Sequence, residues 1–244
     1  MSSIMSSPDP STFHHLAGQM TLLEHLEELR NRLIKSAIAV LVCTFLAAAF
    51  TNQILTLLIR PYGEKLQILG PTEGIAIFFR VALMGGLVLA MPFLIYQFLM
   101  FVLPGLEENE KRYVRWGVPV ATLLFLIGVA FAWFILIPTA IGFLSTFQDD
   151  IFRAEWQSQK YIPFVTSIIF WIGVSFETPL ILFILTKVGL VTPQLLLRQW
   201  RFAVIIIAIL AAMITPTVDP FNMALVMAPL FALYGLSILL SYLA

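Results

Sequence analysis

The sequence predicts an all-α integral membrane protein with six transmembrane helices and with both termini on the cytoplasmic side. Its 244 residues are 60% hydrophobic and only 11% charged, whereas a soluble domain carries about 25% charged residues. The mean hydropathy is +0.94, and the apolar residues gather in long runs separated by short charged clusters. The Lys and Arg residues are divided unequally between the two ends of these runs, which indicates the orientation in the membrane.

The chain divides into a short tail and one membrane domain. Residues 1–20 are rich in Ser and Pro, and we expect a disordered N-terminal tail. Residues 21–244 form the six-span domain. It opens with an amphipathic helix over 21–32, whose leucines recur at helical spacing between charges. We expect this helix to lie in the membrane interface and to lead into the first span.

Six apolar runs predict the six spans. They are Leu33–Leu58, Ile75–Val102, Val114–Ile137, Phe164–Leu185, Phe202–Ile214 and Phe221–Tyr242. The fifth is short: its core rises about 20 Å at 1.5 Å per residue, against a hydrocarbon thickness of about 30 Å. We therefore expect the bilayer to thin locally, or water to enter from one side, at this span.

The distribution of Lys and Arg predicts the orientation. Nine of the 14 lie on one side of the predicted spans, and five belong to the other side when Arg80 is counted there, because Arg80 lies inside the start of the second span and can snorkel to that side. The richer side is expected to be cytoplasmic. The nine are Arg30, Arg32, Lys35, Lys111, Arg112, Arg115, Lys187, Arg198 and Arg201; the five are Arg60, Lys65, Arg80, Arg153 and Lys160.

Several function classes are disfavoured by composition. The formal net charge is zero, so no overall field attracts nucleic acid. The single cysteine, Cys43, cannot form an internal disulfide, and no Cys/His cluster has metal-ligand spacing. No nucleotide-binding glycine motif is present, and we expect no metal and no cofactor. A membrane serine protease that used Ser175 would need a histidine within the membrane, and the sequence places none there.

Two charged clusters lie on the predicted cytoplasmic side. They are Glu24–Arg32, before the first span, and Leu106–Arg112, between the second and third. The simpler interpretation is a solvated collar that fixes topology and pairs its charges internally. Both clusters nevertheless carry several carboxylates, although positive residues alone would suffice for orientation. Carboxylates on one face can each accept a guanidinium bidentately, so the natural ligand of such a surface is a peptide with paired arginines.

Glu177 is the only charged residue of its apolar run. A carboxylate at the centre of a span costs roughly 2.5 to 3.5 kcal/mol on insertion scales. One interpretation is a protonated acid hydrogen-bonded to a neighbouring helix. Another is a polar contact for an incoming transmembrane helix. A third is a proton site, which would suit a proton-coupled secondary transporter, although the sequence shows neither an inverted repeat nor a relay of further buried charges.

Four motifs give the chain a resemblance to the TatC family of the twin-arginine translocase, over about Leu22 to Tyr242. They are His25-Leu-Glu-Glu-Leu-Arg-Asn-Arg32, the loop from Tyr96 through Pro104-Gly-Leu-Glu-Glu-Asn-Glu110 to Arg112, the span motif Phe176-Glu177-Thr-Pro179, and the turn Thr215-Pro216 to Asp219. The resemblance implies six tilted helices in a concave, glove-like arrangement, with both termini cytoplasmic, in the inner or plasma membrane.

The resemblance also implies a function. Members of the family bind the twin-arginine signal peptides of folded precursor proteins. They assemble with single-span TatA- and TatB-type subunits into a complex that is driven by the proton-motive force. We therefore expect a non-enzymatic receptor and core subunit that forms a homo-oligomer within that complex.

Site residues are carried over by motif position. Glu28 and Glu110 would contact the arginine pair, Arg30 would sit beside them, and Pro104 would set the loop that presents Glu110. Glu27 is an additional acid that is able to share the role of Glu28. The intramembrane Glu177 would face the concave side and meet a partner helix.

Two departures from the family pattern affect the last predicted span. The turn before it reads Thr215-Pro216-Thr-Val-Asp219, where the family commonly has Thr-Pro-Pro-Asp. We assign Pro216 and Asp219 to this periplasmic loop. Gly235 stands where many members carry glutamate, so a partner contact that this acid makes elsewhere would be made differently here.

Overall fold

The computed structural model describes residues 22–102, 111–147, 150–151, 155–187, 189–215 and 219–243. These residues are helical apart from connecting turns and one isolated bridge between Gln67 and Gln157. The elements are α1 (Leu22–Ala48), α2 (Thr51–Ile59), α3 (Glu73–Val102), α4 (Lys111–Phe131), a π-helical turn η2 (Ala132–Leu136), α5 (Ile137–Thr146), α6 (Ser158–Ser175), α7 (Thr178–Lys187), α8 (Pro193–Arg198), α9 (Trp200–Ile214) and α10 (Pro220–Ser241).

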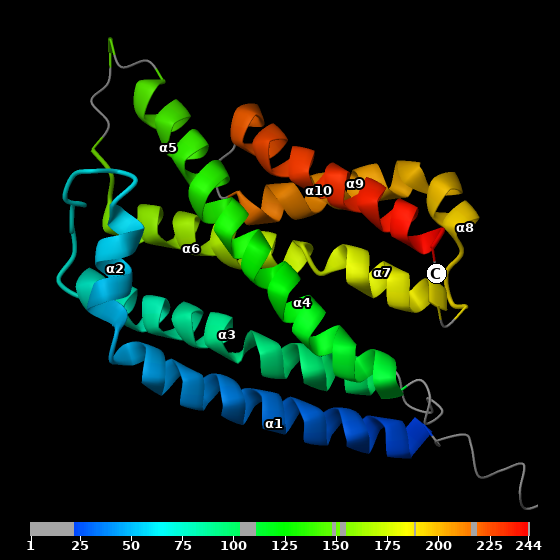
Figure 1. Ribbon diagram of the computed structural model, residues 1–244. Coiled ribbons are helices and arrows are strands. Elements are labelled where there is room, and N and C mark those ends of the chain that lie inside the picture. The colour runs from blue at the N-terminus through cyan, green and yellow to red at the C-terminus, as the bar shows by residue number, and fades with distance from the viewer. Residues whose placement is uncertain are drawn as a thin grey trace, which may run out of the picture.

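Five helical stretches are long and apolar enough to cross a membrane. A sixth, α9, is apolar but shorter. The predicted set of six apolar helices with a short fifth member is therefore confirmed. The five stretches are His25–Ala48, Glu73–Phe101, Gly117–Thr146, Ser158–Lys187 and Pro220–Ser241. The start of α1 and the end of α10 lie at the same end of the molecule, which we call the terminal end (Figure 1).

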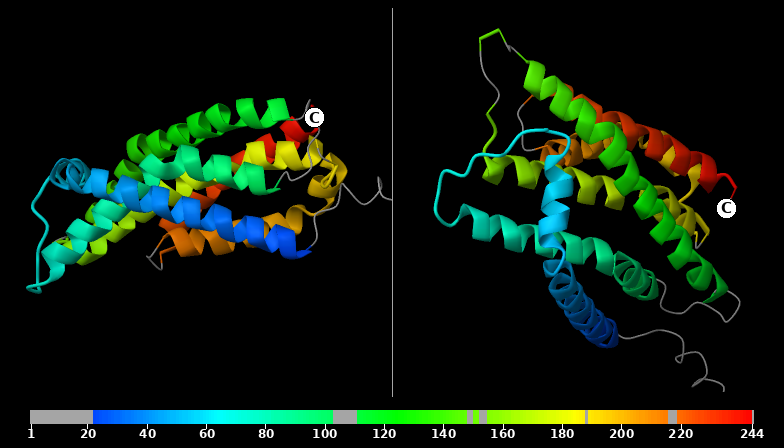
Figure 2. Two further views of the ribbon diagram at one scale, coloured as in Figure 1. Left: turned by 90° about the horizontal axis from the view of Figure 1, so that it is seen from below. Right: turned by 60° about the vertical axis from the view of Figure 1, so that its left-hand side comes forward.

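The first span differs from the prediction. The amphipathic segment runs directly into the first span, as its leucine spacing predicts, because α1 continues without a break from Leu22 to Ala48. The chain turns at Ala49 and Phe50, where the Phe50 N–H donates to the Ala47 carbonyl at 2.9 Å. The Thr51 hydroxyl donates to the same carbonyl at 3.2 Å. The last apolar residues of the predicted span form α2 instead, which points sharply away from α1 (Figure 2).

Prolines explain two irregularities inside the spans. Pro138 cannot donate an N–H to the carbonyl four residues earlier, and the preceding turn widens into the π-helical η2. Pro179 likewise has no N–H to donate to the Ser175 carbonyl, and the fourth span is interrupted between Ser175 and Thr178. Each break leaves a local departure from the helical ladder at membrane depth.

Close approaches at glycines hold the helices together. The helices α1 and α3 lie along each other (Figure 1), and a Cβ atom on Gly86 would lie 2.4 to 2.6 Å from atoms of Thr44. The helices α4 and α6 cross at another such point. A Cβ atom on Gly173 would lie 2.6 Å from the Phe125 ring, and one on Gly128 would lie 2.9 Å from the Gly173 Cα. Small residues at these positions let the helix backbones approach, as in many membrane bundles.

The opposite end of the molecule is closed by the segment between α2 and α3. The Gln67 N–H donates to the Trp156 carbonyl at 3.0 Å, and the Ser158 N–H donates to the Gln67 carbonyl at 2.9 Å. Glu73 is 4% exposed at the start of α3. Its carboxylate accepts hydrogen bonds from the Leu69 N–H at 2.7 Å and from the Gln157 amide. The buried charge thereby satisfies donors from two connecting segments.

We predict that Gly86→Ala destabilises the protein by about 1 to 3 kcal/mol, because overpacking at a closed contact costs that much. Thermal unfolding in detergent measures the effect. Gly235→Ala is the matched control, because a Cβ atom there meets nothing within 4 Å, and the gain in helix propensity should leave this variant as stable as the parent or more so. Equal stability of the two variants would contradict the tight packing of α1 on α3.

Candidate functional site

The half-buried carboxylate of Glu28 is held at the terminal end by a partner on its own helix. The Arg32 guanidinium donates from Nε to Glu28 Oε1 at 2.8 Å and also from Nη2 to the same oxygen. The exposed fractions of the two side chains are 20% for Glu28 and 18% for Arg32. A pair so far withdrawn from water is held more firmly than an ordinary surface ion pair.

Arg32 also joins α1 to α3. Its Nη1 donates to Gln97 Oε1 at 3.1 Å, and Gln97 is only 6% exposed. Earlier on α1, the His25 ring stacks on Phe101 with centroids 4.6 Å apart. These contacts fix the start of α1 against the end of α3 and orient the Glu28 carboxylate.

Glu28 keeps one unused acceptor. Its Oε2 is buried and has no hydrogen-bond partner among the described residues. An unsatisfied buried carboxylate oxygen is costly in a folded chain. An incoming donor, such as a guanidinium, would satisfy it.

Glu27 and Arg30 form a separate and exposed pair. Their side chains are 67% and 68% exposed, and the ion pair measures 3.4 Å. The structure therefore places Arg30 beside Glu27, while Arg32 takes the place next to Glu28. The two acids line one shallow depression of about 360 Å³ together with Asn31, Arg32 and Lys35.

Other predicted residues of this surface lie outside the described part of the chain. Glu110 and Pro104 fall between Val102 and Lys111, which are the last residue of α3 and the first residue of α4. Both helix ends lie at the terminal end, where α1 also begins (Figure 1). The connection that carries Glu110 therefore joins helices at the end of the molecule that holds Glu28.

Glu177 occupies the break between α6 and α7. Its N–H donates to the Val174 carbonyl at 3.0 Å, and its own carbonyl accepts from the Ile181 N–H at 2.9 Å. The residue is 5% exposed, and its Oε1 has no hydrogen-bond partner among the described residues. The Gly128–Gly173 crossing brings α4 onto α6 directly before this break. The acid is therefore buried within a stretch that is long and apolar enough to cross a membrane, and one of its oxygens has no partner among the described residues.

Asp219 has a structural role at the start of α10. It is the N-cap of α10: its Oδ1 accepts from the Asn222 N–H at 2.7 Å, and its Oδ2 accepts from the Asn222 amide at 2.9 Å. An aspartate in this position satisfies donors that the first turn of a helix leaves free. Pro216, which we predicted for the same loop, lies outside the described residues.

The described residues offer no metal centre, because no three His, Cys, Asp or Glu side chains among them are grouped suitably. The acids at the terminal end are instead accompanied by Arg and Lys, which is the composition of a surface that binds through ion pairs.

Comparison with known proteins identifies the family. The family model of the Sec-independent protein translocase protein (TatC) matches residues 24–229. This chain belongs to the TatC family. The TatC protein of Deinococcus radiodurans is 40% identical over 232 residues, which cover 90% of this chain and 85% of that protein. The TatC protein of Helicobacter pylori is 36% identical over 220 residues, which cover 90% and 87%.

A solved TatC structure has the same fold. The crystal structure of a twin-arginine translocase receptor TatC matches this chain with a TM-score of 0.82 at 35% identity, over 90% of this chain and 99% of that one. The match confirms the predicted all-α fold class and the resemblance to the TatC family. TatC proteins are multi-pass membrane proteins and are not enzymes.

Within this TatC fold, sequence reasoning missed Arg32 and Gln97. The i, i+4 spacing of Glu28 and Arg32 on a helix was a usable signal for their pair, but Arg30 matched the family motif more directly. Gln97 is 65 residues from Arg32 in the sequence, and no local pattern connects the two. Both residues act on the site by holding Glu28.

We predict that Arg32→Met lowers the free energy of unfolding by about 1.5 to 3 kcal/mol, because it removes charge-assisted hydrogen bonds from a half-buried carboxylate. Arg30→Met is the matched control and should cost under about 1 kcal/mol, since its pair is exposed. Thermal or denaturant unfolding in detergent compares the two. An equal or larger loss for Arg30→Met would contradict the assignment of Arg32 as the partner that holds Glu28.

Proposed function

We propose that this chain is the signal-peptide receptor and core subunit of a twin-arginine protein translocation system. The observation that carries the proposal is the Glu28 carboxylate, which is oriented through one oxygen by Arg32 and keeps the other without a partner among the described residues. Membership of the TatC family supports the same conclusion. The solved relative is described as a twin-arginine translocase receptor.

Recognition would depend on geometry rather than on a strong local field. The depression around Glu28 is lined by two acids and two basic residues, so its charges nearly balance. A peptide guanidinium gains most by donating to Glu28 Oε2, which is buried and without a partner among the described residues, so the side chains that cover it would move aside to admit the donor. A second guanidinium would pair with Glu110. Arg32 keeps Oε1 occupied and so directs the ligand to Oε2. A planar fork of donors suits this task better than a lysine ammonium does.

Partner subunits of the system would meet the chain at membrane depth. We propose that single-span TatA- and TatB-type subunits contact the region of Glu177, and that copies of this chain assemble into a homo-oligomer. Glu177 is 5% exposed, so a partner helix would reach its open oxygen by separating the packed helices around the α6–α7 break. We place the chain in the cell membrane with both termini in the cytoplasm, on the basis of the Lys/Arg bias.

The secondary-transporter alternative receives no support from the relatives, which are named as translocase proteins. Glu177 is also the only charged side chain among the described buried residues besides Glu73. Glu73 lies at the start of α3 and is engaged by Leu69 and Gln157. Two acids at different depths with no basic residue buried beside them do not make a proton relay.

We predict that Glu28→Gln weakens binding of a labelled twin-arginine signal peptide about tenfold, because a charge-assisted hydrogen bond becomes a neutral one. Glu110→Ala, with Glu28 intact, should weaken binding as well. Glu64→Gln is the matched control, since Glu64 lies in the pocket at the opposite end of the molecule. Fluorescence anisotropy in detergent measures the three affinities. Unchanged affinity in Glu28→Gln would remove the receptor site from this position.

We predict that Glu177→Ala reduces cross-linking to a TatA- or TatB-type partner several-fold while signal-peptide affinity stays unchanged. The reason is that the variant deletes a membrane-depth acceptor far from the terminal end. Thr122→Ala is the control, because the Thr122 hydroxyl bonds the Val118 carbonyl of its own helix at 2.8 Å. If Glu177→Ala lost both signal-peptide binding and cross-linking, Glu177 would belong to the signal-peptide site instead. If neither measurement changed, Glu177 would contact neither the signal peptide nor the partner subunit.

A further inference from the structure

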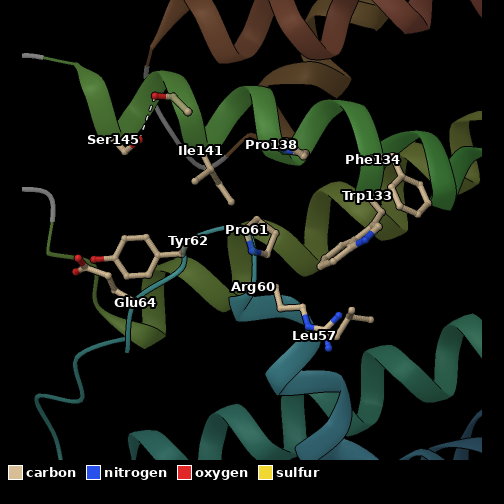
Figure 3. Close-up of a pocket in the computed structure, with 11 residues that line it drawn as sticks. Leu57, Arg60, Pro61, Tyr62, Glu64, Trp133, Phe134, Pro138, Ile141 and Ser145 are labelled. Atoms are coloured by element: carbon tan, nitrogen blue, oxygen red, sulfur yellow. Dashed lines mark hydrogen bonds between the residues drawn. The ribbon is translucent and has the colours of Figure 1, made fainter.

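Two cavities meet at the end of the molecule opposite the terminal end, where Glu28 lies. One, of about 620 Å³, lies between the end of α2 and η2–α5 and has polar and charged side chains in its wall (Figure 3). The other, of about 610 Å³, is an apolar groove bordered by residues of α1, α2, α3, α4 and α6. Leu57, Trp133 and Phe134 line both. The two cavities therefore adjoin at these three side chains, and we refer to them together as the cleft, with a polar part and an apolar part.

The apolar part of the cleft faces the depth at which lipid chains lie. Val88, Ile169 and Phe170 in its wall belong to stretches that are long and apolar enough to cross the membrane. Thr166 and Trp133 are the side chains of the wall that carry an O–H or N–H, and the Thr166 hydroxyl donates to the Ile162 carbonyl of its own helix at 2.7 Å. The rest of the wall is apolar, so the groove favours an occupant that is hydrocarbon in character.

The polar part carries a cation at its junction with the groove. Arg60 follows Leu57 by three residues, so the two lie on one face of the end of α2. Figure 3 shows the Arg60 side chain extending along Leu57, with Glu64 farther off beside Tyr62. The ion pairs seen among the described residues lie at the terminal end, so no described carboxylate neutralises Arg60. Trp133 adds an indole ring of the kind that favours the membrane interface.

We propose that this cleft binds one membrane phospholipid, whose phosphate is held by Arg60 and one of whose acyl chains lies in the apolar groove. A guanidinium matches the geometry of a phosphate. Its position at the rim of a hydrocarbon groove matches the place of the phosphate in a phospholipid, between the headgroup and the chains. The bound lipid would lie between the end of α2 and η2–α5, whose side chains form the wall of the polar cavity.

The size of the groove favours a lipid chain over a helix. A transmembrane helix about 10 Å wide and about 30 Å long fills more than roughly 2,000 Å³. The apolar groove holds about 610 Å³, which is a fraction of that volume. A partner helix or a second copy of this chain could lie across the opening but could not enter, whereas a single acyl chain can.

Native mass spectrometry of the purified full chain tests the site, with phosphatidylglycerol as the probe and a diacylglycerol with the same chains as its phosphate-free counterpart. We expect one tightly retained phosphatidylglycerol, and binding about tenfold weaker for the diacylglycerol and for Arg60→Gln, because each removes the charge-assisted contact. The affinity of Arg60→Lys for phosphatidylglycerol should lie between those of the parent and Arg60→Gln. Arg80→Gln is the matched control, because Arg80 is exposed on α3 and lines neither cavity.

A second variant tests the groove. Ala130→Phe places a ring in the apolar wall, and it should displace the lipid while leaving Arg60 in place. Signal-peptide binding serves as the folding check for every variant, since its site is at the other end. Equal binding of phosphatidylglycerol and diacylglycerol, equal binding by Arg60→Gln and the parent, or retention of detergent alone would each overturn the proposal. Binding of a hydrophobic peptide in preference to lipid would overturn it too.

Discussion

A bilayer supplies no hydrogen bonds, and the arrangement of this chain follows from that constraint. Backbone groups at membrane depth are satisfied within helices, and the places where a helix yields are few and have local causes. Pro138 and Pro179 remove a donor from the ladder, which gives η2 and the gap between α6 and α7. Small residues then let the helices approach closely enough to exclude lipid, as Gly128 and Gly173 do directly before that gap.

The same constraint sorts the acids of the chain. Glu73 accepts from two segments at one end, and Glu28 is held by Arg32 at the other. Glu177 lies between these ends with one oxygen that has no partner among the described residues. A carboxylate that is fully satisfied belongs to the architecture. One that is oriented yet keeps an open oxygen has a place for a ligand, and this distinction separates Glu73 from Glu28 and Glu177.

Sequence patterns predicted much of the fold and the neighbourhood of the site, because bilayer thickness and hydrogen-bond satisfaction leave few alternatives for apolar runs. They failed where a contact joins distant segments or where the chain turns within an apolar run. The predicted first span reached Leu58, but the chain turns at Ala49 and Phe50, and the last apolar residues form α2. Arg32 was overlooked because its role depends on Gln97 as well as on Glu28. The burial of Glu177 follows from the α4–α6 crossing, which composition does not encode.

The central claim is that an oriented carboxylate at the start of α1 selects arginine by the shape of its donor group and not only by its charge. The most direct test is the affinity of the purified protein in detergent for a labelled twin-arginine signal peptide, beside the same peptide with both arginines replaced by lysine. The account predicts that the arginine peptide binds about tenfold tighter or better, since a guanidinium can aim two coplanar N–H donors at the one remaining Glu28 oxygen, as Arg32 does at Oε1, and a second guanidinium can pair with both oxygens of Glu110. Equal affinities for the two peptides, at equal net charge, would contradict it.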